Sequence, residues 1–526
     1  MFAEFYETAR DILAKATKEG RVIRNPDSAA LRAFALAAPE VCESRHGSVV
    51  AESEPTAIAT SFTRNNVDTP FGQPEQNLLI EARKRLADEK LISMDVQVGD
   101  GGQGITARLI VPLRHAHVAY GGQKLFLPTE TEDPTYQVLM FFDENFASNK
   151  DRILAQKDIA VRIALSPQGQ MVKIVRNSNY FGEWKKGVFA GEDHRVKQTG
   201  DAIFLHAGCR KDTLETARGP YRASCSLFVA LSGTGKTSTT CKVLARKGQE
   251  RSWLIQDDGG ALTRDGRFLG YEGGGLRVKT EGLNPGEQLE AYYASLKPST
   301  FLENVHVEPD GSFDFYNLER NSNGRAVVER RDFMHASREI NAERIDNLFI
   351  ITRGNIIPAV AKLTHTQAAA YMVLGQSMDL SAIADPTQAG KTKNVFFYDP
   401  YIVGSRAKHA NLFYEILSAN PHIQCYLLNT GWIGMGERMR DIRLSDTMGI
   451  LDSVLRGGLE DWTVSERTGL PVPNSIRLAD SILVQPERLF PVAEFKRRQQ
   501  ALNQQQAQFI QRIPDLHPDI KAVFRH

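Results

Sequence analysis

Residues 228–239 read FVALSGTGKTST, and this stretch decides the fold class of the second part of the chain. The segment SLFVAL (226–231) is apolar and rich in strand-forming residues, and SGTGK (232–236) then makes a glycine turn. TSTTCKVLARKG (237–248) has the composition of a helix, with Gly248 placed as its C-cap. A strand, a glycine loop and a helix in this order are the context that a Walker-type motif requires. The sequence therefore predicts a P-loop within an α/β domain.

The residues of this loop suit the phosphates of a nucleotide. Glycines at 233 and 235 let backbone N–H groups point into the loop, Lys236 can reach the terminal phosphates, and the Thr237 hydroxyl can bind a metal ion. The pattern GxxxxGK[ST] would place Gly where this chain has Ala230, and Ala fits there if its φ is an ordinary negative angle. We expect the nucleotide to be held by Ser232, Gly233, Thr234, Gly235, Lys236, Thr237 and Ser238.

Two acids follow the next apolar segment. RSWLIQDDGG (251–260) reads as a short strand that ends at Asp257 and Asp258. Carboxylates at the carboxyl end of a strand beside a phosphate loop can hold a divalent metal ion, directly or through its waters. Because Asp258 follows Lys236 by only 22 positions, we expect the two elements to be the ends of neighbouring strands.

The composition limits the partners of the protein. Lys and Arg number 64 and Asp and Glu number 63 among 526 residues, so no net field attracts nucleic acid or an acidic membrane. The five cysteines are scattered and form no CxxC pair, which argues against a disulfide framework or a zinc cluster and indicates reduced core thiols. The N-terminal segment 1–15 lacks the basic start and apolar block of a secretory signal, and no run approaches the roughly 18 apolar residues of a membrane helix. We expect a cytoplasmic protein.

The rest of the chain contains both helix-like and strand-like segments, which is typical of a mixed α/β fold. Residues 1–20 have helical spacing, with Phe5, Ala9, Ile12 and Leu13 on one face, and 494–512 reads as a terminal helix. Short strand-like runs occur at 107–113, 136–142 and 170–175. GDGGQG (99–104) could form a phosphate loop, but a strand follows it instead of a helix, and a hairpin turn is favoured.

The motifs, taken in order, resemble those of the ATP-dependent phosphoenolpyruvate carboxykinase family. The similarity spans roughly residues 180–475, more than half of the chain. It is carried by YFGEWKKG (180–187), HAG (206–208), ALSGTGKT (230–237), LIQDD (254–258), YEGGGLRVKT (271–280), LENVHVEPDGSFDF (302–315), NGRA (323–326), LLNTGW (427–432) and SDT (445–447). The resemblance implies two α/β lobes, which we place at 1–222 for the substrate side and 223–526 for the P-loop nucleotide-binding domain.

The resemblance also implies roles for individual residues. Lys186, His206 and Asp258 would bind a transition metal, typically Mn²⁺, with Asp257 beside them, and Thr237 would contact Mg²⁺ at the phosphates of ATP. A lysine can ligate only as the neutral amine, which a nearby dication and Lys185 would favour. Lys185, Lys236, Lys279 and Arg325 would supply positive charge, and Tyr180 would lie at the substrate. Glu303 and Thr447 would belong to the nucleotide site.

The reaction that the resemblance implies is reversible decarboxylation of oxaloacetate and phosphorylation of the resulting enolate by ATP, giving phosphoenolpyruvate, CO₂ and ADP. Two alternatives stay open: a P-loop kinase acting on another acceptor, and a non-catalytic nucleotide sensor. The family's substrate-binding arginine has no clear counterpart, and Arg108 is a weak candidate. Arg438, Arg440 and Arg443 compete for the arginine of the base site.

Overall fold

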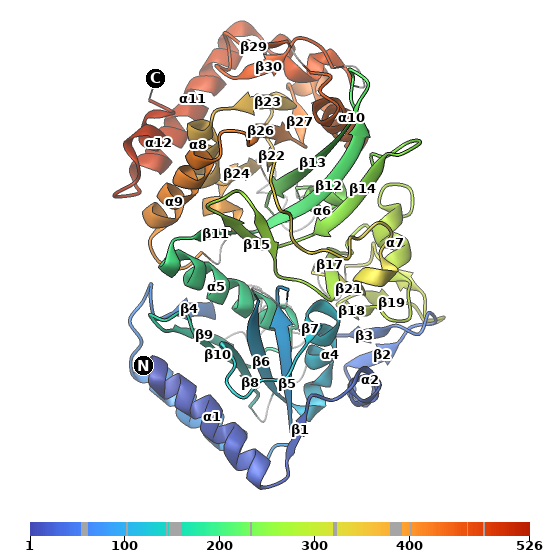
Figure 1. The fold of residues 1–526 in the computed structure, drawn as a ribbon, viewed down its shortest axis with the longest axis vertical. Helices are drawn as coiled ribbons and strands as arrows, with labels where there is room; N and C mark the ends of the chain where they lie inside the picture. Colours follow the sequence, from blue (N-terminus) through green and yellow to red (C-terminus); the bar gives the residue numbers. More distant parts are fainter. Residues whose placement is uncertain are drawn as a thin grey trace. The chain divides into compact units, whose positions relative to one another are not determined.

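The computed structural model describes the chain except for residues 54–61, 101–103, 144–145, 147–158, 232–233, 319–322, 379–391, 400–401, 460, 477–478 and 526. The described residues form two compact units, and each is assembled from two separate stretches of the chain. The first unit comprises Met1–Thr199 and Gly270–Met334, and the second comprises Gly200–Leu269 and His335–His526. Figure 1 shows their helices and strands.

The first unit contains a large mixed sheet. Its described strands are β1 (Val22–Arg24), β5 (Leu91–Val98), β6 (Ile105–Pro112), β8 (Tyr136–Phe141), β10 (Met171–Arg176), β9 (Ala160–Leu165) and β4 (Thr63–Asn65), in that order across the sheet, with β7 (Leu127–Pro128) paired to β5. The runs predicted as strands at 107–113, 136–142 and 170–175 are therefore strands. β5 and β6 pair antiparallel, with Val98 opposite Ile105, which confirms the predicted hairpin; residues 101–103 of the connecting stretch lie outside the described residues.

Helices pack on both faces of this sheet. Side chains alternate along a strand, and Leu139 and Phe141 of β8 share a core with α1 (Phe2–Lys18) and α3 (Gln73–Arg85). Tyr136 and Val138 point the other way, where Gly191 and Gly187 of α5 (Gly182–Thr199) approach them. The predicted helix at residues 1–20 is thus confirmed, and Phe5, Ala9 and Ile12 are buried.

A second sheet of the first unit joins distant stretches of sequence. Its described strands run in the order β17 (Gly275–Lys279), β21 (Arg325–Glu329), β18 (Phe301–Glu303), β3 (Val49–Ala51) and β2 (Val41–Glu43). β18 pairs parallel to β3, which brings residues near 300 beside residues near 50. The unit also contains α2 (Ser28–Leu36), α4 (Ala116–Leu125), α7 (Leu289–Ser295) and the hairpin β19 (His306–Val307) with β20 (Phe313–Asp314).

The second unit is built on the sheet that carries the P-loop. Its described strands run in the order β14 (Arg251–Gln256), β12 (Ala207–Glu215), β13 (Tyr221–Val229), β22 (Asn347–Thr352), β26 (Gln424–Asn429) and β23 (Val360–Leu363). Shorter pairings are β11 (Ala202–Leu205) with β15 (Gly260–Thr263) and β16 (Phe268–Gly270), β24 (Gln376–Met378) with β25 (Thr392–Asn394), β27 (Trp432–Ile433) with β28 (Arg440–Asp441), and β29 (Trp462–Val464) with β30 (Pro471–Pro473). The helices are α6 (Lys236–Cys241), α8 (His365–Leu374), α9 (Arg406–Ala419), α10 (Leu444–Leu455), α11 (Val492–Gln511) and α12 (Pro518–Ala522).

The helix after the P-loop is shorter than predicted. The sequence predicts a helix over 237–248, whereas α6 ends at Cys241 and Lys242 is already extended, with φ −74° and ψ 133°. The N–H groups of Leu244 and Ala245 are bonded to the Ser252 hydroxyl, so side chains replace the helical hydrogen bonds. Gly248 lies in a turn with φ +59° and does not cap a helix.

Three further expectations can be compared with the fold. The terminal helix predicted at 494–512 is present as α11. Four cysteines are buried, but Cys42 is exposed because it lies on the edge strand β2, so the expectation of five core thiols was wrong for this residue. The predicted division at residue 222 stays a prediction about functional domains, and the chain passes from one compact unit to the other at 199/200, 269/270 and 334/335. None of the helices in the described part of the chain combines the length and apolar character needed to cross a membrane.

Candidate functional site

The P-loop, Asp258 and His206 gather at one edge of the sheet in the second unit, and the strand directions explain why. β12 lies between β13 and β14 and runs antiparallel to both. The carboxyl ends of β13 and β14 therefore share an edge with the amino end of β12. The P-loop follows β13, Asp257 and Asp258 follow β14, and His206 precedes β12. The expectation that β13 and β14 are neighbours was wrong, because β12 separates them.

The charged groups at this edge are in direct contact. Lys236 donates hydrogen bonds from Nζ to Asp258 Oδ1 at 2.5 Å and to the carbonyl oxygen of Asp257 at 2.6 Å. His206 Nε2 lies 2.7 Å from the same Asp258 oxygen, and His206 Nδ1 lies 3.9 Å from Asp399 Oδ2. Asp257 is buried. An imidazole and a carboxylate this close offer the N/O donor set that a divalent metal ion accepts, so the residues present fit such an ion.

The described part of the P-loop has the backbone that its sequence predicts. Gly235 has φ +97°, a conformation that favours glycine, and it directly precedes Lys236 at the start of α6. Ala230 is buried and has a negative φ, which meets the condition for Ala in place of Gly. Thr430, after β26, donates a hydrogen bond from Oγ1 to the Thr234 carbonyl oxygen at 2.7 Å. This bond connects the P-loop to the segment LLNTGW (427–432).

The other residues predicted to bind the nucleotide are placed as follows. Thr237 and Ser238 are half-buried in α6, while Ser232 and Gly233 lie outside the described residues. Thr447 is buried in α10, which contacts α6. Arg438, Arg440 and Arg443, the competing base-site arginines, are all exposed.

A second cluster of predicted residues lies in the first unit. Tyr180 is buried and its hydroxyl accepts a hydrogen bond from Arg277, and Lys186 Nζ lies 5.1 Å from the centre of the Tyr180 ring. Burial opposes ionisation of Tyr180, but the Arg277 and Lys186 cations outweigh it and lower the pKa of the hydroxyl. The arrangement surrounds a buried phenol with positive charge.

Glu303, at the end of β18, belongs to this same cluster. Its Oε1 accepts the Phe181 N–H at 2.7 Å, and Arg277 lies 3.9 Å from Oε2. Burial, only partly offset by Arg277, raises the pKa of Glu303 to about 7. The structure thus brings Glu303 together with Tyr180 within the first unit.

The remaining predicted cations of the first unit are each paired with an acid. Lys185 Nζ lies 2.6 Å from Glu272 Oε1, and both side chains are buried. Lys279 and Arg325 are opposite each other on β17 and β21, and both contact Glu281, at 3.6 Å and 3.1 Å. These contacts hold Lys279 and Arg325 side by side.

Several residues of these clusters were not among the site residues predicted from the sequence. Arg277 lies within the quoted segment 271–280, and the two-residue period of a strand puts it on the same face as Lys279, so a signal was available. Asp399 carries no local signal, because only the fold brings it to His206. Arg108, the weak candidate for the substrate arginine, is buried in a bidentate pair with Asp95 at 2.7 Å and 3.0 Å.

Comparisons with known proteins agree with the motifs. The model of the family described as phosphoenolpyruvate carboxykinase matches residues 38–481. A protein of Chelativorans sp. (strain BNC1) named phosphoenolpyruvate carboxykinase (ATP) is 24% identical over 89% of this chain and 87% of its own length. Relatives of the same name from Christiangramia forsetii and Mesorhizobium japonicum are 26% and 25% identical. Those matches cover 60% and 65% of this chain and only 57% and 61% of the relatives.

Proposed function

This chain belongs to the phosphoenolpyruvate carboxykinase family, and we propose that it catalyses the reversible, ATP-dependent conversion of oxaloacetate to phosphoenolpyruvate, CO₂ and ADP. The relatives carry the activity and its nucleotide in their names. The observation that carries the proposal is the contact of Lys236, Asp258 and His206 at the end of the P-loop sheet. The proposed nucleotide site and the candidate metal-binding pair would therefore share one edge of this sheet.

The second unit would bind the nucleotide. In this proposal Lys236 leaves Asp258 to contact the terminal phosphates of ATP, and backbone N–H groups of the loop bind the phosphate oxygens. Thr237 would face the Mg²⁺ that accompanies the phosphates. His206 contacts the same Asp258 oxygen as Lys236 does, so Asp258 would keep its contact with His206 after Lys236 is released.

The family requirement for a divalent cation fits His206 and Asp258. Lys186, in the first unit, is proposed as a further ligand on the resemblance of 180–187 to the family motif. When bound, a divalent cation of the Mn²⁺ type would stabilise the negative charge that decarboxylation places on the enolate oxygen.

The first unit would bind and orient the organic substrate. Tyr180 and Arg277 offer a hydroxyl and a guanidinium in contact, suited to a substrate carboxylate. Lys279 and Arg325, held by Glu281, would neutralise charge on the transferring phosphoryl group, since such transfer depends on positioning and charge more than on a strong base.

The proposal is tested by assaying the purified protein in the reverse direction. It is incubated with phosphoenolpyruvate, bicarbonate, ADP and Mn²⁺, and both oxaloacetate and ATP are measured. We expect both products in equal amounts, and Lys236→Ala and His206→Ala to lower kcat by about 100-fold or more. Parallel reactions with Mg²⁺, GDP or pyrophosphate test the choice of metal and phosphate carrier.

Two control variants make the result specific. Lys247→Ala removes an exposed lysine from the segment after the same loop, and His365→Ala removes a histidine at the start of α8. Both should keep near wild-type kcat. ATP binding without turnover would contradict the proposal in favour of a nucleotide sensor, and phosphate transferred to a protein would favour a different kinase.

A further inference from the structure

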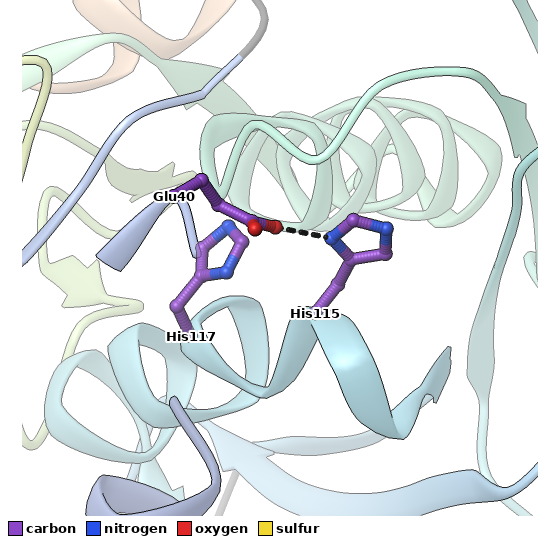
Figure 2. Close-up of side chains that lie close together, drawn as sticks. All are labelled: Glu40, His115 and His117. Carbon is purple, nitrogen blue, oxygen red and sulfur yellow. Dashed lines mark hydrogen bonds and ion pairs between the residues drawn. The ribbon is translucent and has the colours of Figure 1, made fainter. Parts of the chain in front are cut away.

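Glu40, His115 and His117 form a compact cluster in the first unit, separate from the residues discussed above. One ligand atom from each, two imidazole nitrogens and a carboxylate oxygen, lie within 4.8 Å of one another. Figure 2 shows the three side chains turned toward one another, with the hydrogen bond between Glu40 and His115. His115 Nδ1 and Glu40 Oε1 are 2.9 Å apart.

The backbone explains how two histidines only two positions apart can face one acid. In a continuous helix such residues point about 200° apart around the axis. His115 instead ends the short 3₁₀ helix Leu113–His115 and has φ −112° and ψ 37°, and α4 begins only at Ala116. The break in the helix turns both rings toward Glu40, which lies just before β2.

The hydrogen bonding of His117 leaves a lone pair on its Nδ1 atom, inside the protein. His117 is fully buried, and its Nε2 lies 2.9 Å from the Asn179 carbonyl oxygen. A carbonyl can only accept, so Nε2 carries the proton and Nδ1 does not. Nδ1 has no hydrogen-bond partner among the described residues. An outer hydrogen bond from a ring N–H to a carbonyl is the usual support of a metal-binding histidine.

The charges of the cluster also suit a cation. Burial, together with the neighbouring His115, lowers the pKa of His117 to about 4, so this ring is neutral near pH 7. Burial opposes ionisation of Glu40, but the hydrogen bond from His115 and smaller interactions together outweigh it and lower the pKa of the carboxyl. A half-buried carboxylate thus lies beside a buried imidazole that can act as a neutral ligand.

We propose that Glu40, His115 and His117 bind a divalent transition-metal ion of the zinc type. Two imidazoles and one carboxylate, with a further position for water, are a donor set that Zn²⁺ accepts. Bond lengths of about 2.0–2.2 Å place tetrahedral ligand atoms about 3.3–3.6 Å apart. The Glu40 and His115 atoms, now 2.9 Å apart, would therefore separate slightly, and ligand atoms that are up to 4.8 Å apart would approach each other. The ion replaces the proton between His115 Nδ1 and Glu40, and that proton moves to His115 Nε2 or to solvent.

The experiment uses Co²⁺ as a spectroscopic probe of the full-length protein. A background variant, His206→Ala with Asp258→Asn, removes the other candidate metal-binding pair, so the result does not depend on the proposed function. We expect this metal-free background protein to bind one Co²⁺ with the d–d absorption of nitrogen and oxygen ligands. Glu40→Gln and His117→Asn should each weaken that binding by more than about tenfold.

A matched control and a folding check keep the test decisive. His194→Gln alters another buried histidine, whose Nε2 contacts the Ser166 carbonyl at 2.9 Å, and should leave Co²⁺ binding unchanged. Circular dichroism and thermal unfolding without metal identify variants that fail to fold, and Glu40→Gln preserves the size of the side chain. Zn²⁺ should raise the Tm of the background protein and not that of a folded Glu40→Gln variant. Absence of Co²⁺ binding, or equal binding by the folded Glu40→Gln variant, overturns the proposal.

Discussion

At the scale of single residues, Glu303 shows how burial and charge compete in the first unit. It is 1% exposed and accepts a backbone hydrogen bond, which favours its ionised form. Burial nevertheless dominates and raises its pKa to about 7, despite the nearby guanidinium of Arg277. Near neutral pH this carboxyl is therefore poised between its two forms, beside Tyr180.

This environment predicts a pH dependence of stability. The folded pKa of Glu303 is about 7 against an ordinary value of 4.5, so the folded state binds a proton more tightly than the unfolded state. The stabilisation of the folded state that comes from this tighter proton binding is fully present below pH 4.5 and is lost as the pH rises to about 7. The loss should reach about 3 kcal/mol of the free energy of unfolding. Denaturant unfolding from pH 5 to 8 measures it.

The comparison variant for this prediction is Glu303→Gln, whose amide oxygen can still accept the Phe181 N–H. Its unfolding free energy should fall less than that of the wild type as the pH rises from 5 to 7. Glu287→Gln, which alters an exposed glutamate of the same unit, should follow the wild type. If all three proteins show the same pH profile, the raised pKa of Glu303 is wrong.

At the scale of elements, the helices and strands that local sequence patterns specify could be predicted. Features that depend on hydrogen bonds from residues outside the segment could not. The P-loop strand, the hairpin at 99–104 and both terminal helices follow from local periodicity and turn residues. The end of α6 at Cys241 does not, because Ser252 from the next strand takes the N–H groups of Leu244 and Ala245. For the same reason, Asp399 and the insertion of β12 between β13 and β14 were missed.

Arg210 connects β12 to α6 through a hydrogen bond, and this contact leads to a prediction. This buried arginine on β12 forms a bidentate pair with Asp212, at 2.7 Å for both bonds, and donates to the Thr239 carbonyl of α6 at 2.9 Å. Arg210→Met leaves Asp212 buried without its cation and should cost about 3–5 kcal/mol of unfolding free energy. Denaturant unfolding measures this cost, and ATP affinity should also weaken because α6 loses its anchor.

A double variant separates the two effects of Arg210. In Arg210→Met with Asp212→Leu neither position of this pair carries a buried charge, so most of the lost stability should return. The Thr239 carbonyl still lacks its donor, and ATP binding by calorimetry should stay weak. Recovery of both stability and ATP affinity would show that Arg210 does not position α6.

At the scale of the whole molecule, the two compact units are interleaved along the chain, and local sequence patterns did not reveal this. Residues 270–334 return to the first unit and add β17, β18 and β21 to the sheet begun by β2 and β3. The Glu40, His115 and His117 cluster was missed for a related reason. Its acid lies 75 positions from the nearer histidine, and no local motif links them.

The interleaving predicts how fragments of the chain behave. A fragment of residues 1–222 lacks β18, so β3 loses its parallel partner, and it lacks Glu272, so the 3% exposed side chain of Lys185 is left without its ion pair. We expect this fragment to be largely unfolded. A fragment of residues 1–334 contains the complete first unit and should fold, with 200–269 as an unstructured insert.

Limited proteolysis with mass spectrometry distinguishes the two fragments. The 1–334 fragment should be cut within 200–269 while 1–199 and 270–334 stay associated and protected, and the 1–222 fragment should be digested throughout. Circular dichroism should show a cooperative thermal transition for the longer fragment only. A cooperative transition of 1–222 at a similar Tm would mean that residues 270–334 are dispensable for the first unit. The buried pairs of Lys185 with Glu272 and of Tyr180 with Arg277 would then contribute little to its stability.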